Sequence, residues 1–324
     1  MKIVKKLIAP VLVVGLLMTS LLTLHHLKTS KHQKIKIGIS QYITHKSLDA
    51  TQKGFVEELA KQGYVDGEEI EIDYQNAQGE QRNLKNISNQ LSQESDLVFA
   101  IATPSAQSIA NTSKTTPVVF SAVTDPLAAK LVKNLDQPGG NVTGTSDQSS
   151  DAIATQVDLI QKVLPKAKTI GILYTQSEPN SVVQKEEAKK VLEAKGYRVV
   201  EKTILDSNNV KAAADSLMSE VDMVFVPTDN IISSTMETIK QVSLKHQVPV
   251  IGGSIEMAQV GGLYTYGTDY TELGRQSARM AIRILNGEKA ANLAVEAPKN
   301  LELYVNKEMA KKLGIDLSGI NEKK

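Results

Sequence analysis

The chain has 324 residues, 41% hydrophobic and 23% charged, which is the composition of an ordinary soluble globular protein with enough length for two cores. Its formal net charge of +1 gives no long-range field to attract nucleic acid, so we expect no nucleic-acid partner. The absence of cysteine excludes disulfides, thiolate catalysis, cysteine-ligated metals and lipid attachment through an N-terminal cysteine.

Residues 1–34 are predicted to be a signal segment or membrane anchor. Lys2, Lys5 and Lys6 precede an apolar run over residues 7–24, which is the order of a secretion signal. This run is longer than a usual signal core of roughly 7–15 residues, and no A-x-A-like cleavage site follows it. We therefore expect an extracytoplasmic protein held by an uncleaved N-terminal anchor, with a cleaved signal as the alternative.

The rest of the chain is predicted to contain two similar lobes. The Ile-Gly-Ile sequence at 37–39 recurs at 170–172, and the Gly-Tyr pair at 63–64 recurs at 196–197, in both cases about 130 residues later. Solenoid repeats reach only roughly 50 residues, whereas this distance is about the size of one domain. Two lobes in tandem predict a cleft between them.

In the first lobe, short apolar strands alternate with amphipathic helices. The helix over 47–62 places Leu48, Phe55 and Leu59 on one face and ends at Gly63, a residue suited to the left-handed turn after a helix. The predicted elements are strands over 36–39, 70–74, 97–101 and 118–120, and helices over 47–62, around 84–91 and from about 105.

The second lobe repeats this order, after a strong turn signal at 136–141. Its predicted strands cover 169–173, 197–200, 223–226 and 248–251, and its helices cover 181–195, 210–218 and 231–245. A strand over 263–266, a helix over 270–286 and a strand over 301–305 then give the chain enough material to return to the first lobe and cross back.

These patterns predict an α/β fold with two doubly wound parallel-sheet lobes joined by a multi-strand hinge. We expect lobe one to comprise 35–145 plus about 268–290, and lobe two 146–267 plus about 291–324.

Candidate ligand-binding residues follow the predicted strands, because open parallel α/β sheets bind ligands beyond the carboxyl ends of their strands. Hydroxyl, amide and acidic side chains are concentrated at six such turns. Helix capping alone is the more probable role for any single one of them, but capping does not require six polar turns to converge on one cleft. The candidates are Gln41, Tyr42, Thr103, Ser105, Thr124, Asp125, Tyr174, Glu178, Asn180, Ser181, Thr228, Asp229, Asn230, Gly253 and Tyr270.

Several of these candidates have two readings that the sequence does not separate. Asp229 either pairs with a ligand ammonium or caps a helix, and Glu178 has the same ambiguity. The tyrosines at 42, 174 and 270 either wall the pocket or only pack. His45 either edges the cleft or, as we favour, is an exposed residue at a helix start.

An enzyme is not predicted. The sequence has no GxxxxGK[ST], GxGxxG, GxSxG or HExxH motif, and its five histidines do not have metal-ligand spacings, so we expect no cofactor and no metal. A transcription regulator built on two such lobes would carry an N-terminal helix-turn-helix, where this chain has an apolar run.

Together the motifs resemble the substrate-binding proteins of ABC transporters in the tryptophan and tyrosine uptake group. The similarity runs from about residue 35 to 316. It is carried by Ile37-Gly38-Ile39 with Gln41, the stretch 72–79 (IDYQNAQG), Ala102-Thr103-Pro104, Val123-Thr124-Asp125-Pro126, the stretch 138–144 (PGGNVTG), Ile170-Gly171-Ile172-Leu173-Tyr174, the stretch 226–230 (VPTDN) and Gly267-Thr268-Asp269-Tyr270.

This resemblance implies a periplasmic-binding-protein fold of type I with a three-strand hinge, and capture of tryptophan, phenylalanine or tyrosine. It also implies that most of the candidates above surround the ligand. Two departures stand out: members from Gram-positive bacteria are commonly lipoproteins, whereas this chain has no cysteine, and Ser254 is not followed directly by an acidic residue.

The predicted function is therefore capture of a small amino acid, of the aromatic class that the resemblance implies, and its delivery to an ABC permease by a monomeric protein. The polar strand ends suit a zwitterion, whereas the aromatic ligand is implied by the resemblance alone. The alternative is an extracytoplasmic sensor subunit that presents its closed state to a membrane receptor.

Overall fold

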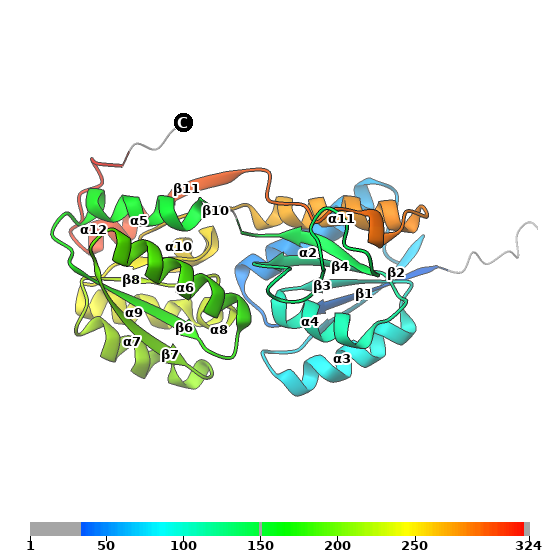
Figure 1. The fold of residues 1–324 in the computed structure, drawn as a ribbon, viewed down its shortest axis with the longest axis horizontal. Helices are drawn as coiled ribbons and strands as arrows, with labels where there is room; N and C mark the ends of the chain where they lie inside the picture. Colours follow the sequence, from blue (N-terminus) through cyan, green and yellow to red (C-terminus); the bar gives the residue numbers. More distant parts are fainter. Residues whose placement is uncertain (1–33, 149–150, 321–324) are drawn as a thin grey trace, which may run out of the picture. The chain divides into compact units, whose positions relative to one another are not determined.

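The computed structural model describes residues 34–148 and 151–320. From Lys36 onward they belong to one compact unit that contains two β-sheets (Figure 1). The predicted signal or anchor lies outside the described residues, apart from Lys34. No helix within the described ranges is long and apolar enough to cross a membrane.

The first sheet has the strand order β2-β1-β3-β4-β5, and β1, β3, β4 and β5 pair in parallel. Helices α2 and α11 pack together on one side of it, and α3 and α4 pack together on the other (Figure 1). The elements are β1 (Ile35–Gln41), α2 (Lys46–Lys61), β2 (Ile70–Asn76), α3 (Gln81–Glu94), β3 (Leu97–Ile101), α4 (Thr103–Thr112), β4 (Val118–Val123), β5 (Val142–Ser146) and α11 (Tyr270–Leu285).

The second sheet has the order β11-β10-β9-β8-β6-β7. Its strands are parallel except β11, which runs antiparallel to β10. The elements are α5 (Ala152–Val163), β6 (Thr169–Thr175), α6 (Pro179–Ala194), β7 (Arg198–Ile204), η1 (Ser207–Asn209), α7 (Val210–Met218), β8 (Met223–Phe225), α8 (Asn230–Ser234), α9 (Met236–His246), β9 (Val250–Ile251), α10 (Ile255–Val260), β10 (Tyr264–Thr268), η2 (Ala290–Asn292), β11 (Leu301–Val305) and α12 (Lys307–Lys312).

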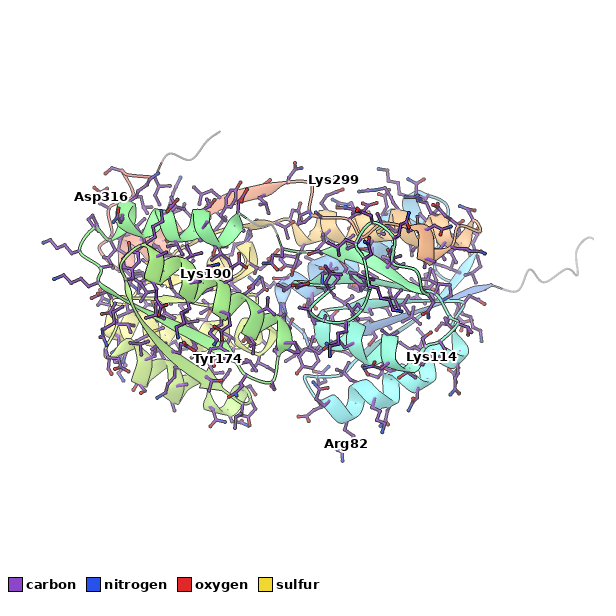
Figure 2. All side chains as sticks on the ribbon, in the orientation of Figure 1. Arg82, Lys114, Tyr174, Lys190, Lys299 and Asp316 are labelled. Carbon is purple, nitrogen blue, oxygen red and sulfur yellow. The ribbon has the colours of Figure 1, made fainter. Side chains whose placement is uncertain are left out.

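The two α/β lobes, each built around one of these sheets, confirm the predicted fold class. Central strands such as β3 and β4 are buried along their whole length, because helices cover both faces of the sheet. Charged side chains of the covering helices point outward, as Arg82 and Lys190 do in Figure 2.

The chain passes between the two sheets after β5, between β10 and α11, and between Glu296 and Leu301. Backbone hydrogen bonds from Val295 N–H to Leu135 O and from Glu296 N–H to Gly144 O place this returning segment beside the first sheet, before β11 joins the second. Three connections of this kind lie where we predicted the hinge, and a hinge motion about them is a proposal.

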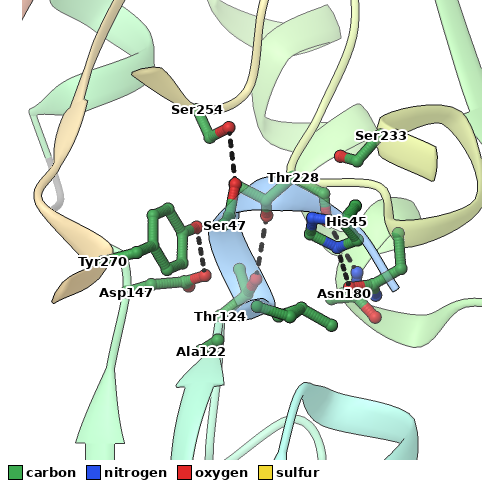
Figure 3. A pocket seen from close by; sticks show the side chains of 12 residues that line it. His45, Ser47, Ala122, Thr124, Asp147, Asn180, Thr228, Ser233, Ser254 and Tyr270 are labelled. Atoms are coloured by element: carbon green, nitrogen blue, oxygen red, sulfur yellow. Dashed lines mark hydrogen bonds between the residues drawn. The ribbon is translucent and has the colours of Figure 1, made fainter. Parts of the chain in front are cut away.

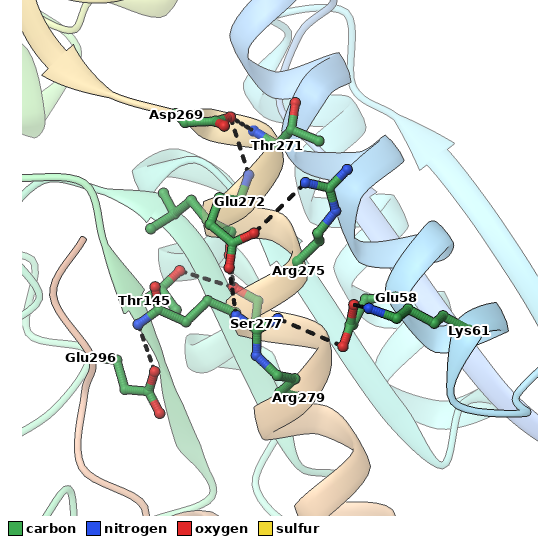
Figure 4. A network of polar contacts seen from close by, with 12 residues as sticks. Glu58, Lys61, Thr145, Asp269, Thr271, Glu272, Arg275, Ser277, Arg279 and Glu296 are labelled. Atoms are coloured by element: carbon green, nitrogen blue, oxygen red, sulfur yellow. Dashed lines mark hydrogen bonds and ion pairs between the residues drawn. The ribbon is translucent and has the colours of Figure 1, made fainter. Parts of the chain in front are cut away.

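Helices α2 and α11 approach closely because each has a glycine at the contact. A Cβ on Gly54 would lie 2.0 Å from Thr271 O, and a Cβ on Gly274 would lie 2.0 Å from Thr51 O. Beside this contact, Arg279 bonds Glu272 at 2.6 Å and lies 3.6 Å from a carboxylate oxygen of Glu58 (Figure 4). Polar pairs therefore flank a backbone contact that anchors α11 to the first sheet.

The helix predicted over 231–245 is two helices, α8 and α9, which meet at Thr235. The Thr235 hydroxyl donates to the carbonyls of Ile231 and Ile232, and its backbone (φ −115°, ψ 17°) leaves the helical conformation.

Strand β5 and helices α5, α10 and α12 were not predicted. Strand β5 reads VTGTS and lacks an apolar run, and it buries hydroxyls instead: Thr143 donates to Leu293 O, and Thr145 pairs with Ser121 and Ser277.

Candidate ligand-binding site

A pocket lies between the carboxyl ends of the two sheets (Figure 3). Of the described residues that line it, none is Lys or Arg, and Asp147 is the one carboxylate. Hydroxyls and amides from both sheets supply most of the polar surface. The lining consists of His45, Ser47, Leu48, Ala122, Thr124, Asp147, Asn180, Thr228, Asn230, Ser233, Ser254 and Tyr270.

Three side-chain contacts join the two sides of this pocket. Ser47 Oγ lies 3.0 Å from Ser254 Oγ, and Thr124 Oγ1 lies 3.1 Å from Thr228 Oγ1. The third contact, between His45 Nε2 and Asn230 Oδ1, is 3.2 Å long. The lobes therefore touch directly around the pocket, which is a closed arrangement.

Asp147 follows β5 and has one free carboxylate oxygen. The Tyr270 hydroxyl donates to Asp147 Oδ2 at 2.8 Å, whereas Oδ1 is buried and makes no hydrogen bond within the described residues. Burial raises the pKa of Asp147, partly offset by the Tyr270 and Thr124 hydroxyls. An ionised Asp147 thus lacks a counter-charge that a cationic ligand group would supply.

Asn180 presents a second acceptor without a partner. Its Nδ2 donates to Thr228 O at 2.8 Å and to Glu178 Oε2 at 3.2 Å, which fixes Oδ1 as the end of the amide without a partner. The side chain is 5% exposed, and Oδ1 has no hydrogen bond within the described part of the chain. The pocket therefore offers acceptors from both sides.

His45 precedes α2 and donates to Asn230. Asn230 Nδ2 donates to Glu178, so Asn230 Oδ1 must accept from His45 Nε2. Burial lowers the pKa of His45 to about 4, so its ring is neutral at pH 7. The His45 side chain does not cap α2, and the free N–H groups of the helix start lie beside the pocket residues Ser47 and Leu48.

A second cavity adjoins the pocket and shares Asp147, Thr228 and Tyr270 with it. Its lining has more apolar side chains than the lining of the first pocket, although it also contains amide side chains. The rest of its lining is Gln148, Ala152, Ile153, Gln156, Gln184, Phe225, Gly253, Tyr266, Gly267, Thr268 and Leu301. The two cavities therefore meet at the three residues that they share.

Six of the predicted residues line these spaces. Thr124, Asn180, Thr228, Asn230 and Tyr270 line the first pocket, and Gly253 lines the second cavity. The remaining nine lie outside both linings: Gln41, Tyr42, Thr103, Ser105, Asp125, Tyr174, Glu178, Ser181 and Asp229.

Asp229 caps α8, which is one of the two roles that the sequence left open. It is fully buried, and Oδ1 accepts from Ile232 N–H and from the Thr175 hydroxyl. Oδ2 accepts from Thr175 N–H and from the Ser181 hydroxyl. No oxygen of this carboxylate is left for a ligand.

Glu178 supports the same buried region and bonds the pocket residues Asn180 and Asn230. Its oxygens accept from the backbone N–H groups of Asn230 and Ile231 and from the Asn180 and Asn230 amides. Burial, with the nearby charge of Asp229, raises the pKa of Glu178 to about 8. Glu178 thus positions the pocket residues Asn180 and Asn230 and does not line the pocket itself.

Most of the other residues outside the pockets have local partners. In the first lobe, Ser105 donates to Ser40, Gln41 to Asp49, and the Tyr42 hydroxyl to Gly79 O. Asp125 accepts from the N–H groups of Leu127 and Ala128, and buried Thr103 Oγ1 has no partner among the described residues. Tyr174 packs against the core of the second lobe, beneath the Lys185 ammonium.

The sequence interpretation missed Asp147, Ser47 and Ser254 as site residues, and it favoured the wrong surroundings for His45, which is half-buried at the pocket. A signal for Asp147 existed: it follows directly on a strand, at the position where the carboxyl-end rule predicts a ligand group. That strand was not recognised, so the rule was not applied there.

Comparison with known proteins agrees with this architecture. Residues 36–321 match the family model described as ABC transporter substrate binding protein. A tyrosine-binding protein from Clostridioides difficile (strain R20291) is 39% identical over 287 residues, covering 88% of this chain and 83% of the relative.

Two solved structures are similar over nearly the whole described chain. An ABC domain from Streptococcus pneumonia in complex with L-Trp is 38% identical, with a TM-score of 0.84, and the match covers 88% of this chain and 96% of that one. The ligand-free, open structure of a substrate-binding protein with adhesive properties from Clostridium difficile is 41% identical, with a TM-score of 0.66, covering 87% and 95%. The chain belongs to the ABC transporter substrate-binding proteins, a non-enzymatic family of extracytoplasmic solute-binding proteins.

Proposed function

We propose that this protein binds an aromatic L-amino acid, with the polar end of the ligand in the first pocket and its ring in the second cavity. The observation that carries the proposal is the free Oδ1 of Asp147, a buried carboxylate oxygen on the boundary that the two cavities share. A ligand ammonium there forms a charge-assisted hydrogen bond and supplies the missing counter-charge.

The ligand carboxylate is assigned to hydroxyl and backbone donors, because no Lys or Arg lines either cavity among the described residues. Ser47, Thr124 and Ser254 supply hydroxyl groups. The N-terminal end of α2 adds free N–H groups and the positive end of a 16-residue helix dipole. This combination accepts an anion without fixing a full positive charge in the pocket.

The relatives support an aromatic ligand and a closed arrangement. One relative is a tyrosine-binding protein, and one structure holds L-Trp. This chain has a TM-score of 0.84 with the L-Trp complex and 0.66 with the open, ligand-free structure, at similar identity and coverage. The difference supports lobes that close over a ligand by rotation about the three connections between the sheets.

The route of the ligand after capture completes the proposal. The closed protein delivers its ligand to an ABC permease as a monomer, held at the outer face of the membrane by residues 1–34. An uptake assay separates this role from a sensory one: deletion of the gene is expected to reduce import of the bound amino acid, whereas unchanged import would support the sensor alternative.

Calorimetry of the full chain against single amino acids, nucleosides and sugars tests the ligand class. We expect a dissociation constant near the micromolar range, about −8.2 kcal/mol, for at least one aromatic L-amino acid. The same amino acid with its ammonium acetylated is the matched control and is expected not to bind. Preference for a sugar or nucleoside, or unchanged affinity for the acetylated ligand, would refute the proposal.

A further inference from the structure

The second cavity contains a fixed hydrogen-bond acceptor at Gln156. This residue is on α5, is 4% exposed, and lines the cavity. Its Nε2 donates to Tyr266 O at 3.0 Å and to Thr265 Oγ1 at 3.2 Å. Both amide hydrogens are therefore used by β10, and the buried Oε1 makes no hydrogen bond within the described residues.

The orientation of this amide cannot reverse at low cost. A flipped Gln156 would place Oε1 against the carbonyl oxygen of Tyr266, two acceptors at hydrogen-bond distance, and would leave the Nε2 hydrogens facing the cavity. Burial of an acceptor without a partner is unfavourable, so a ligand that donates to Oε1 has an advantage over one that does not.

The surroundings of Gln156 define what kind of donor fits. Ile153, Phe225 and Leu301 give the cavity apolar walls, and Tyr266 and Tyr270 add aromatic surface. Asp147, the proposed ammonium partner, lies where this cavity meets the first pocket. Of the other two amide side chains in the lining, Gln184 already accepts from Thr228 through its Oε1, and Gln148 donates to Glu187 through its Nε2. A ring that extends from Asp147 into the cavity therefore lies near Gln156 Oε1, a buried amide oxygen that no donor of the described residues satisfies.

We propose that Gln156 is a specificity-determining residue that accepts a hydrogen bond from a donor on the ligand ring, either an indole N–H or a phenol O–H. The proposal rests on the function proposed above and deepens it. It predicts selection for tryptophan or tyrosine against phenylalanine, whose ring leaves Oε1 unpaired. A site built around such an acceptor rejects an analogue lacking the donor by about tenfold or more.

The ligand side of the test uses the unaltered full chain and pairs of nearly isosteric ligands. Calorimetry compares tyrosine with phenylalanine, and tryptophan with 3-benzothienyl-L-alanine, in which sulfur replaces the indole N–H. In the pair that contains the tighter-binding natural ligand, we expect the analogue without the donor to bind at least about tenfold more weakly. A difference below twofold would overturn the role of Gln156.

The protein side uses Gln156→Met, which removes the acceptor and keeps a similar length. We expect it to weaken binding of the donor-bearing ligand about tenfold while changing phenylalanine affinity less than twofold. Gln161→Met, at an exposed position of the same helix, is the matched control and is expected to retain the preference. If Gln156→Met keeps the preference, the inference is wrong. A chain that binds no aromatic amino acid refutes the proposed function, a result distinct from binding without discrimination.

Discussion

The Tyr270 hydroxyl donates to Asp147 Oδ2 at 2.8 Å, and this bond joins two of the three places where the chain passes between the sheets. Asp147 follows the last strand of the first sheet, and Tyr270 begins the helix that follows β10. The carboxylate is thereby oriented with its other oxygen free toward the pocket (Figure 3). The same two residues therefore belong to the connection between the lobes and to the proposed ligand site.

Replacement of Asp147 by Asn tests its assignment as the ammonium partner. The variant keeps the shape of the side chain and removes its charge, so we expect amino-acid affinity to fall about 10- to 100-fold, the equivalent of the roughly 1.5–3 kcal/mol of a hydrogen bond to a charged group. Calorimetry gives the ratio. Asp125→Asn, outside the pocket lining, is the control and should bind within about threefold of the unaltered chain. Equal affinities for the two variants would remove Asp147 from the site.

Tyr270→Phe is expected to change the pH dependence of binding. An ammonium is bound by ionised Asp147, so affinity should fall as the pH decreases through the pKa of this carboxyl, which burial has already raised. Loss of the Tyr270 hydroxyl removes a hydrogen bond that favours the ionised form, so the decline should begin at a higher pH. Calorimetry between pH 5 and pH 8 measures this shift. An identical profile for both chains would contradict the coupling.

Asp229→Ala should lower stability far more than ligand affinity. Removal of the carboxylate leaves the buried N–H groups of Thr175 and Ile232 without their acceptor, and each such loss costs about 1–3 kcal/mol. Urea unfolding measures the free energy, and calorimetry under folding conditions measures affinity. The control is Asp206→Ala, an exposed N-cap whose loss should cost about 1 kcal/mol. A large affinity loss with unchanged stability would restore the ammonium role.

Glu178 gives the unliganded protein a pH-dependent stability with a defined sign. Its pKa is about 8 in the folded chain against 4.5 for an ordinary glutamate. Between these values the folded state binds more protons than the unfolded state, so this group's stabilising contribution is lost as the pH rises toward 8. His45, with a folded pKa of about 4, acts in the opposite direction only below about pH 6.5. Above about pH 6.5 the opposing contribution of His45 is therefore absent.

The measurement is urea unfolding of the unliganded chain and of Glu178→Gln at several pH values between about 6.5 and 8. The free energy of unfolding of the unaltered chain should decline more steeply with pH than that of the variant, which has no proton to lose at this position. Parallel curves would show that Glu178 is ionised throughout, with hydrogen bonds from Asn180, Asn230 and Ile231 outweighing its burial.

More of the scaffold than of the candidate ligand site could be predicted from the sequence. The strands containing Ile37 and Ile170 are recognisable because each is a short apolar run between turn residues, and β3 was predicted with its correct ends. Strand β5 has no such run, since its Thr side chains are satisfied by partners distant in sequence, such as Leu293 O. With β5 unrecognised, Asp147 was not identified as a strand-end residue.

The two roles considered for Asp229 show why the rest of the site was not predictable. An acid directly after a strand can cap the next helix or face a ligand, and the local sequence is the same in both cases. The outcome depends on Thr175 and Ser181, about 50 residues earlier, which fill the second oxygen of this carboxylate. Similarly, the amide orientation that leaves Gln156 Oε1 without a partner is fixed because Nε2 donates both of its hydrogens to residues of β10.

The contact between α2 and α11 should tolerate no side chain at Gly274. A methyl group there would lie 2.0 Å from Thr51 O, a backbone atom held within α2, so the helices must separate. We expect Gly274→Ala to lower the free energy of unfolding by about 1–3 kcal/mol or more, despite the higher helix propensity of alanine. Urea unfolding with an unchanged m-value would assign the loss to the folded state.

The control is Gly140→Ala, where nothing lies within 4 Å of the added Cβ, and it should change stability by less than about 0.5 kcal/mol. If Gly274→Ala proved as stable as this control, α11 would not be held to the first sheet by close backbone contact, and the connection that positions Tyr270 beside Asp147 would need another anchor.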